Sequence, residues 1–196
     1  KSFLIRVICK WCEKILRKPG DLKPKVLRLS YAAVAASLIG NFRFRNYFET
    51  SFFTTILSFL GGTTLHSGLG FQFGPKQGPL GKEKLDRLKK ELEDAEVVII
   101  DEMSMVSVDH FYHVHKRLMQ IFDSKDDFGG RALLMVGDVM QLPPVKGRPI
   151  YCKPSSLKNF TLMNMKNKEQ QSIGDLWQKL EVVTLKTNFR QGEGDP

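Results

Sequence analysis

The chain has 196 residues, of which 42% are hydrophobic, so it can build one domain with a full core and needs neither disorder nor a disulfide framework. Its three cysteines, Cys9, Cys12 and Cys152, cannot all pair and suit a reducing compartment. The net charge is +9, and the first 28 residues hold nine basic residues against two acidic ones. This bias favours nucleic acid over a membrane as partner, with a solvated basic helix face as the alternative.

Helical and strand patterns alternate along the chain. This alternation predicts the α/β class, with a parallel, doubly wound sheet flanked by helices and right-handed crossovers. Helices are expected at 3–16, 32–38, 82–93, 106–122 and 173–180, and strands at 26–29, 97–100, 132–136 and 182–185. A Gly/Pro-rich loop region separates the first half from the second at 68–81. The most apolar window, 52–60, is far too short to span a bilayer, so we expect a soluble protein with no membrane contact.

Two groups of residues suggest a metal. Cys9-Lys-Trp-Cys12 has the C-x-x-C spacing, but no second ligand pair follows, so a helix that buries small apolar residues is the simpler interpretation. The second group is His110, His113 and His115. An amphipathic stripe in the helix at 106–122 leaves His110 and His113 on its exposed side, and this stripe consists of Val108, Phe111, Val114, Leu118 and Ile121. We therefore expect solvated histidines there.

The strand at 97–100 ends in two adjacent carboxylates, Asp101 and Glu102. An unbroken Val/Ile run is typical of a strand buried on both faces of a parallel sheet. Charged groups are tolerated where such a strand reaches the carboxyl edge, which is where open α/β folds bind ligands. A solvated turn is the alternative interpretation.

The second apolar strand, at 132–136, repeats this design and favours a site. It leads into GDVMQLPPV, which places Asp138 and Gln141 at the same edge. One carboxylate there can hold a hydrated Mg²⁺, while an adjacent Glu orients or deprotonates a water. A Gln amide can contact a terminal phosphate and a water together. The last strand is followed by NFRQ, so Arg190 is expected at this edge, where it can neutralise a transferred phosphoryl group.

The chain begins Lys1-Ser2 and continues directly into a helical pattern. A phosphate-binding loop reads G-x-x-x-x-G-K-[ST] and opens a helix. We therefore expect Lys1 to be the loop's lysine and Ser2 its magnesium-binding hydroxyl, with the glycines upstream. The fold is expected to be truncated at this N-terminal phosphate loop.

The segments IIDEMSMV, FGGRALLMVGDVMQLPPVKGRPIY, GGTTLHSGLGF and NFRQ together resemble the first motor domain of the Pif-type DNA helicases. These are RecD-like members of helicase superfamily one, and the helicases of Helitron transposons are similar. The resemblance implies a P-loop NTPase (RecA-like) fold and a motor that uses ATP and Mg²⁺. It implies 5′ to 3′ movement on single-stranded DNA, unwinding at DNA duplex junctions, and roles in DNA repair, recombination and telomere maintenance.

The resemblance also assigns roles to individual residues. It makes Asp101 and Glu102 the magnesium-holding and water-activating pair, Gln141 the γ-phosphate sensor and Arg190 an arginine finger. Lys1, Ser2 and Asp138 are expected at the nucleotide, and two segments, 30–36 and 63–67, are expected at single-stranded DNA. Their candidate contacts are Ala35, Thr64, His66 and Ser67.

The sequence departs from this pattern in three ways. The first DNA-contacting segment reads SYAAVAA in place of A-P-T-G-x-A-A, so Ala32 and Ala33 replace a Thr and a Gly. Residues 41–61, with six Phe, interrupt the continuous family sequence and are expected to be an insertion, either translated intron sequence or a lineage-specific loop. A second motor domain is expected to be absent, which makes 1–196 an incomplete first RecA-like domain.

Two functions remain open at this point. One is the motor domain of an ATP-dependent DNA helicase, with a nuclear location or, alternatively, a mitochondrial one. The other is a catalytically inactive, transposon-derived fragment that keeps the fold and weak DNA binding. The fragment alone is expected to be inactive, since the backbone amides that normally wrap the phosphates are missing.

Overall fold

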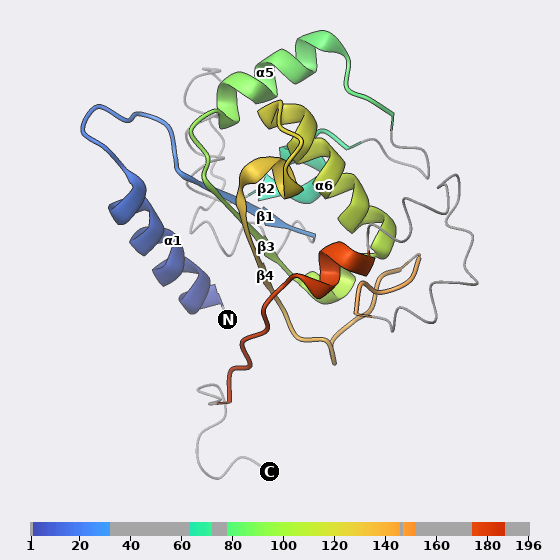
Figure 1. Ribbon diagram of the computed structural model, residues 1–196. Coiled ribbons are helices and arrows are strands. Elements are labelled where there is room, and N and C mark those ends of the chain that lie inside the picture. The colour runs from blue at the N-terminus through green and yellow to red at the C-terminus, as the bar shows by residue number, and fades with distance from the viewer. Residues whose placement is uncertain (1, 32–62, 72–77, 146, 152–173, 187–196) are drawn as a thin grey trace, which may run out of the picture.

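A computed structural model describes residues 2–31, 63–71, 78–145, 147–151 and 174–186. Within them, one parallel sheet has the strand order β2-β1-β3-β4 (Figure 1). The strands are β1 (Val26–Ser30), β2 (Thr63–Thr64), β3 (Val97–Asp101) and β4 (Ala132–Val136). The predicted α/β class with a parallel sheet is confirmed. The short strand β2 was not predicted.

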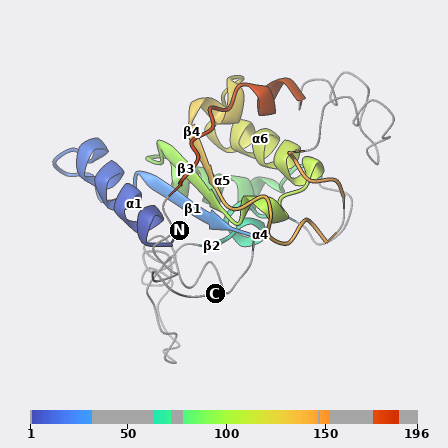
Figure 2. The same ribbon diagram turned by 90° about the horizontal axis from the view of Figure 1, so that it is seen from below.

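Helices cover both faces of this sheet. The α-helices are α1 (Ser2–Leu16), α4 (Leu65–Gly68), α5 (Lys82–Leu92) and α6 (Val108–Phe122), and the 3₁₀-helices are η1 (Met103–Met105) and η2 (Asp127–Gly130). In Figures 1 and 2, α1 lies on one side of the strands, and α5 and α6 lie on the other. Residues 174–178 are also helical, within the predicted 173–180. The predicted helix at 32–38 and the proposed insertion at 41–61 lie outside the described residues.

The two-residue period of the strands divides the core between the two faces. On the α1 side, Ile5 and Cys9 pack against Val26 and Ile99. On the other side, α4, α5 and α6 pack against the alternate strand residues, Leu27, Leu29, Val98 and Ile100. Burial of β3 on both faces explains its unbroken Val/Ile sequence. The strand β1 is also buried on both faces, but the half-buried Arg28 interrupts its apolar residues.

Two expectations about strands were wrong. Residues 133–136 of β4 are only half-buried, because within the described part of the chain β4 pairs with β3 alone. Residues 182–185 form no strand, and Val182 and Val183 are 83% and 85% exposed. An apolar run becomes a strand only where its backbone groups find a neighbouring strand, and no described residue pairs with this one.

Glu13 fixes the C-terminal end of α1 at the start of β1. Its Oε1 accepts hydrogen bonds from the backbone N–H groups of Lys25 (2.9 Å) and Val26 (3.0 Å). The 15 residues of α1 span about 22 Å, and the five of β1 about 17 Å. Because the helix runs back along the strand (Figure 1), its first turn lies toward the carboxyl edge of the sheet.

Glu13→Ala is expected to lower the free energy of unfolding by about 2–4 kcal/mol, because it leaves two buried backbone donors unsatisfied. Urea denaturation would measure this change. Glu91→Ala is the matched control, since the ion pair of Glu91 among the described residues is with Arg87, one helical turn away, at 3.5 Å. Its loss is expected to change stability by less than about 0.5 kcal/mol. Equal shifts in the two variants would contradict the anchoring role of Glu13.

Candidate functional site

The pairing register aligns the C-terminal residues of the four strands with one another. Ser30 pairs with Thr64 on one side and with Asp101 on the other, and Asp101 pairs with Val136. Because side chains alternate along a strand, Ser30 and Asp101 lie on the α1 face of the sheet. The strand ends, including Asp101 as the sequence predicted, therefore lie at the carboxyl edge, and the first turn of α1 lies toward the same edge.

The two adjacent carboxylates of the Asp101–Glu102 turn differ in burial. Asp101 is 1% exposed, and its Oδ1 accepts a hydrogen bond of 2.7 Å from the backbone N–H of Glu102. Glu102 is half-buried and takes the left-handed conformation, with φ 58° and ψ 46°. This conformation is uncommon for a residue with a side chain and concentrates at functional sites. The turn directs the Asp101 carboxylate into the interior and leaves Glu102 at the edge.

The loop after β4 lies directly against this turn. A Cβ atom on Gly137 would lie 2.5 Å from Met103 Cγ and 2.8 Å from Met103 N, so only glycine fits. The Oδ1 of Asp138 accepts a hydrogen bond from Met140 N (2.9 Å), and Gln141 N donates to Asp138 O (3.0 Å). These bonds hold a tight turn that leaves the side chains of Asp138 and Gln141 exposed. Asp138 thus shapes the loop through its carboxylate.

Two buried hydroxyl groups at this edge suit a hydrated cation. Ser30 and Ser104 are fully buried, and neither Oγ atom has a hydrogen-bond partner among the described residues. Mg²⁺ prefers oxygen ligands, keeps several waters, and is usually held by one or two carboxylates together with substrate phosphates. Asp101 with these hydroxyls fits that requirement. The described residues contain no group of three or more His, Cys, Asp or Glu side chains that could hold a metal without such help.

The other predicted nucleotide contacts are only partly placed. Ser2 begins α1, but its side chain, like Lys1 and Arg190, lies outside the described residues. Their convergence on Asp101 stays a prediction.

Of the predicted DNA contacts, Ala35 also lies outside the described residues. Thr64 closes the start of α4, since its Oγ1 accepts a hydrogen bond of 3.2 Å from Ser67 N. Ser67 itself is exposed and His66 is half-buried. The Thr64 hydroxyl therefore has a structural role beside the DNA role that the sequence suggested.

The expectation of solvated histidines on α6 was wrong. His110 is half-buried, and its ring centre lies 5.5 Å from that of Tyr31 and 5.6 Å from that of His66. Burial, together with the nearby His66 and His113, lowers the pKa of His110 to about 4, and burial also lowers the pKa of His113. The helical period correctly predicted the apolar stripe of α6. It did not predict that Tyr31, after β1, and His66, in α4, pack against His110. Only the tertiary structure shows this packing.

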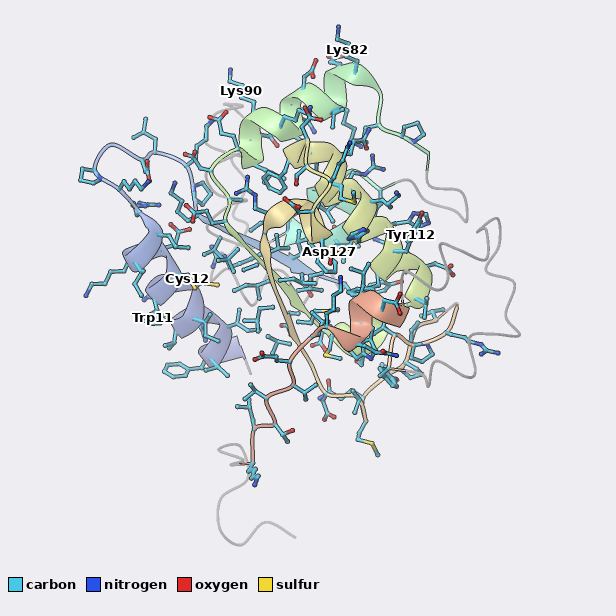
Figure 3. All side chains as sticks on the ribbon, viewed as in Figure 1. Trp11, Cys12, Lys82, Lys90, Tyr112 and Asp127 are labelled. Carbon is cyan, nitrogen blue, oxygen red and sulfur yellow. The ribbon has the colours of Figure 1, made fainter. Side chains whose placement is uncertain are left out.

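The cysteine pair on α1 favours the structural interpretation. Cys9 is buried, and its burial raises the pKa of the thiol to about 11. Burial also raises the pKa of Cys12. Figure 3 shows Cys12 toward the sheet and Trp11 pointing away from it. Both thiols are free and favour the protonated form, which is a poor metal ligand and a poor nucleophile.

In the described part of the chain, no helix combines the length and apolar character that crossing a membrane requires.

Residues 54–195 match the PIF1-like helicase family. The chain is 30% identical over 134 residues to ATP-dependent DNA helicase PIF1 of Danio rerio, covering 63% of this chain and 21% of that protein. It is 39% identical over 94 residues to ATP-dependent DNA helicase Pif1 of Campylobacter jejuni, covering 44% of this chain and 20% of that protein.

The fold is also similar to solved structures. A Bacteroides Pif1 structure bound to ssDNA aligns with a TM-score of 0.50 and 23% identity, covering 89% of this chain and 30% of that chain. A Pif1 structure described for DNA unwinding at forked dsDNA aligns with a TM-score of 0.51 and 23% identity, covering 89% of this chain and 31% of that one. The chain thus spans about a fifth of the curated relatives it matches. The family match covers well over half of its residues, and the chain belongs to the PIF1-like helicase family.

Proposed function

We propose that this chain is the nucleotide-binding motor domain of an ATP-dependent DNA helicase, which couples ATP hydrolysis to 5′–3′ translocation on single-stranded DNA and to duplex unwinding. One observation carries the proposal. The buried Asp101, the left-handed Glu102 and the loop at Gly137 meet at the carboxyl edge of a parallel sheet. That edge is where open α/β folds bind their ligands. The relatives named as ATP-dependent DNA helicases support the same activity.

The residues at this edge would divide the chemistry of hydrolysis. Asp101 would hold the waters of a Mg²⁺ ion that, when bound, neutralises the phosphates. Glu102, which is half-buried, would orient and deprotonate the attacking water. Gln141 would contact the terminal phosphate and that water, and Asp138 would keep its loop in place.

Lys1, Arg190 and the side chain of Ser2, which lie outside the described part, would complete the proposed nucleotide site. Lys1 and Ser2 would contact phosphates and magnesium before the first turn of α1, where helix N–H groups and the helix dipole favour anions. Arg190 would neutralise charge that develops on the transferred phosphoryl group.

The proposed polymer is single-stranded DNA next to a duplex junction. A solved Pif1 structure bound to ssDNA, and another concerned with forked dsDNA, support this substrate. Thr64, His66 and Ser67 lie together at the β2–α4 turn, and Ala35 would approach from the neighbouring segment. We propose a nuclear role in DNA repair, recombination and telomere maintenance, with the mitochondrion as the alternative compartment.

The direct test is ATP hydrolysis by the complete gene product. We expect the rate to require Mg²⁺ and to rise at least about tenfold with single-stranded DNA, since DNA-coupled motors gain transition-state contacts when the polymer orders the site. A duplex with a 5′ tail should be unwound, and one with a 3′ tail should not. DNA binding without any hydrolysis would contradict the enzyme and support the inactive fragment.

A further inference from the structure

We propose that Tyr31, His66 and His110 form a stacking site for a base of single-stranded DNA. The proposal rests on the proposed function and deepens it, because it adds Tyr31 and His110 to the DNA contacts and assigns them to bases and not to phosphates.

The three rings come from three different elements and contact one another. Tyr31 follows β1, His66 lies in α4, and His110 lies in the first turn of α6. The ring centres are 6.1 Å apart for Tyr31 and His66, 5.5 Å for Tyr31 and His110, and 5.6 Å for His66 and His110. The planes are inclined by 77°, 74° and 69°, so each ring is held edge-on by the other two.

This arrangement fixes the rings before any ligand arrives. All three residues are half-buried, so none of them is fully enclosed in the core. A hydrogen bond of 2.9 Å between Ser107 Oγ and the Nδ1 of His110 also orients the His110 ring. Rings that are already ordered lose little side-chain entropy on binding, which favours stacking with a planar base.

The local charge also favours a base over a phosphate. With a pKa of about 4, His110 is neutral at pH 7 and offers a phosphate no cation. Positive charge lies further along the same series of rings. The ring centre of Phe71 lies 6.0 Å from that of His66. The exposed side chain of Lys84 packs against Gly70, the residue before Phe71. A strand could place a base on the ring cluster while its backbone passes this lysine, a division of labour typical of single-strand binding sites.

The sequence around Tyr31 fits this shift from phosphate to base. In SYAAVAA, Ala32 and Ala33 occupy the places of a Thr hydroxyl and of a Gly that allows close backbone approach. The same segment places a tyrosine where the related pattern has proline. The segment has lost the groups that suit a phosphate and has gained one that suits a base.

The test measures single-stranded DNA binding by the complete gene product carrying Tyr31→Leu, Tyr31→Phe or Tyr31→Ala. Leucine keeps the apolar packing but not the ring, whereas phenylalanine keeps the ring, so the pair separates stacking from folding. Affinity would be followed by fluorescence anisotropy at fixed salt, with a normal oligonucleotide and an abasic one. Quenching of 2-aminopurine within the oligonucleotide would report stacking itself.

We expect Tyr31→Leu and Tyr31→Ala to bind the normal oligonucleotide about tenfold more weakly and to quench 2-aminopurine less. Tyr31→Phe should bind and quench as the wild type does, and all variants should bind the abasic strand equally. Wild-type affinity and quenching in Tyr31→Leu would overturn the stacking site, as would an equal loss for normal and abasic strands. If the unmodified protein fails to bind single-stranded DNA at all, the proposed function fails together with this inference.

Discussion

Glu102→Gln is expected to reduce ATP hydrolysis by the complete gene product by about 10²–10⁴-fold while leaving nucleotide binding nearly unchanged. The amide has almost the same shape as the carboxylate but cannot accept a proton from the attacking water. The buried carboxylate of Asp101 accepts its hydrogen bond from the backbone N–H of Glu102, so the substitution leaves the proposed magnesium-holding group unchanged. Steady-state hydrolysis and binding of a fluorescent ATP analogue would measure the two effects separately.

A matched control is Glu83→Gln, in the exposed first turn of α5. It makes the same chemical change away from the carboxyl edge and is expected to leave hydrolysis unchanged. If Glu102→Gln lost nucleotide binding together with turnover, Glu102 would be holding the ligand and not acting on water. Normal turnover in Glu102→Gln would remove it from the mechanism.

Gly137→Ala is expected to damage both stability and hydrolysis. The added methyl group would lie 2.8 Å from the backbone nitrogen of Met103, which cannot rotate away, and 2.5 Å from its Cγ. The loop after β4 must therefore move off the Asp101–Glu102 turn, at a cost of about 1–3 kcal/mol in unfolding free energy. Because a shift of about 1 Å in a positioned group costs about 10²-fold in rate, hydrolysis should fall by a similar factor.

The control for this second variant is Gly78→Ala, because a Cβ at Gly78 meets no atom within 4 Å. Thermal unfolding and steady-state hydrolysis of both variants would be compared with those of the wild type. If Gly137→Ala were as stable and as active as Gly78→Ala, the contact between the Gly137 loop and Met103 would not matter for the site.

The sequence predicted best those elements whose own residues determine their form. The Val/Ile run of β3 is branched, apolar and buried on both faces, so its period and length were sufficient. The carboxyl-edge position of Asp101 followed from the same strand, and its register with Ser30 and Val136 confirms it. For this part of the site, local pattern and topology agree.

The sequence predicted less well those features that depend on neighbours distant in the chain. β2 has two threonines and exists only because Leu29 and Ser30 of β1 pair with it. The half-burial of His110 comes from Tyr31 and His66, which no helical period reveals. The hydroxyl of Ser30 could have been found, since a polar residue ends that strand just as Asp101 ends β3.

The most direct measurement is a crystal structure of the complete gene product with Mg²⁺ and a non-hydrolysable ATP analogue. We expect the triphosphate at the first turn of α1, with the ion's waters on Asp101 and with Glu102 and Gln141 facing the water next to the terminal phosphate. A nucleotide bound on any other face of the sheet, or an ion that ignores Asp101, would contradict the assignment of this edge as the catalytic site.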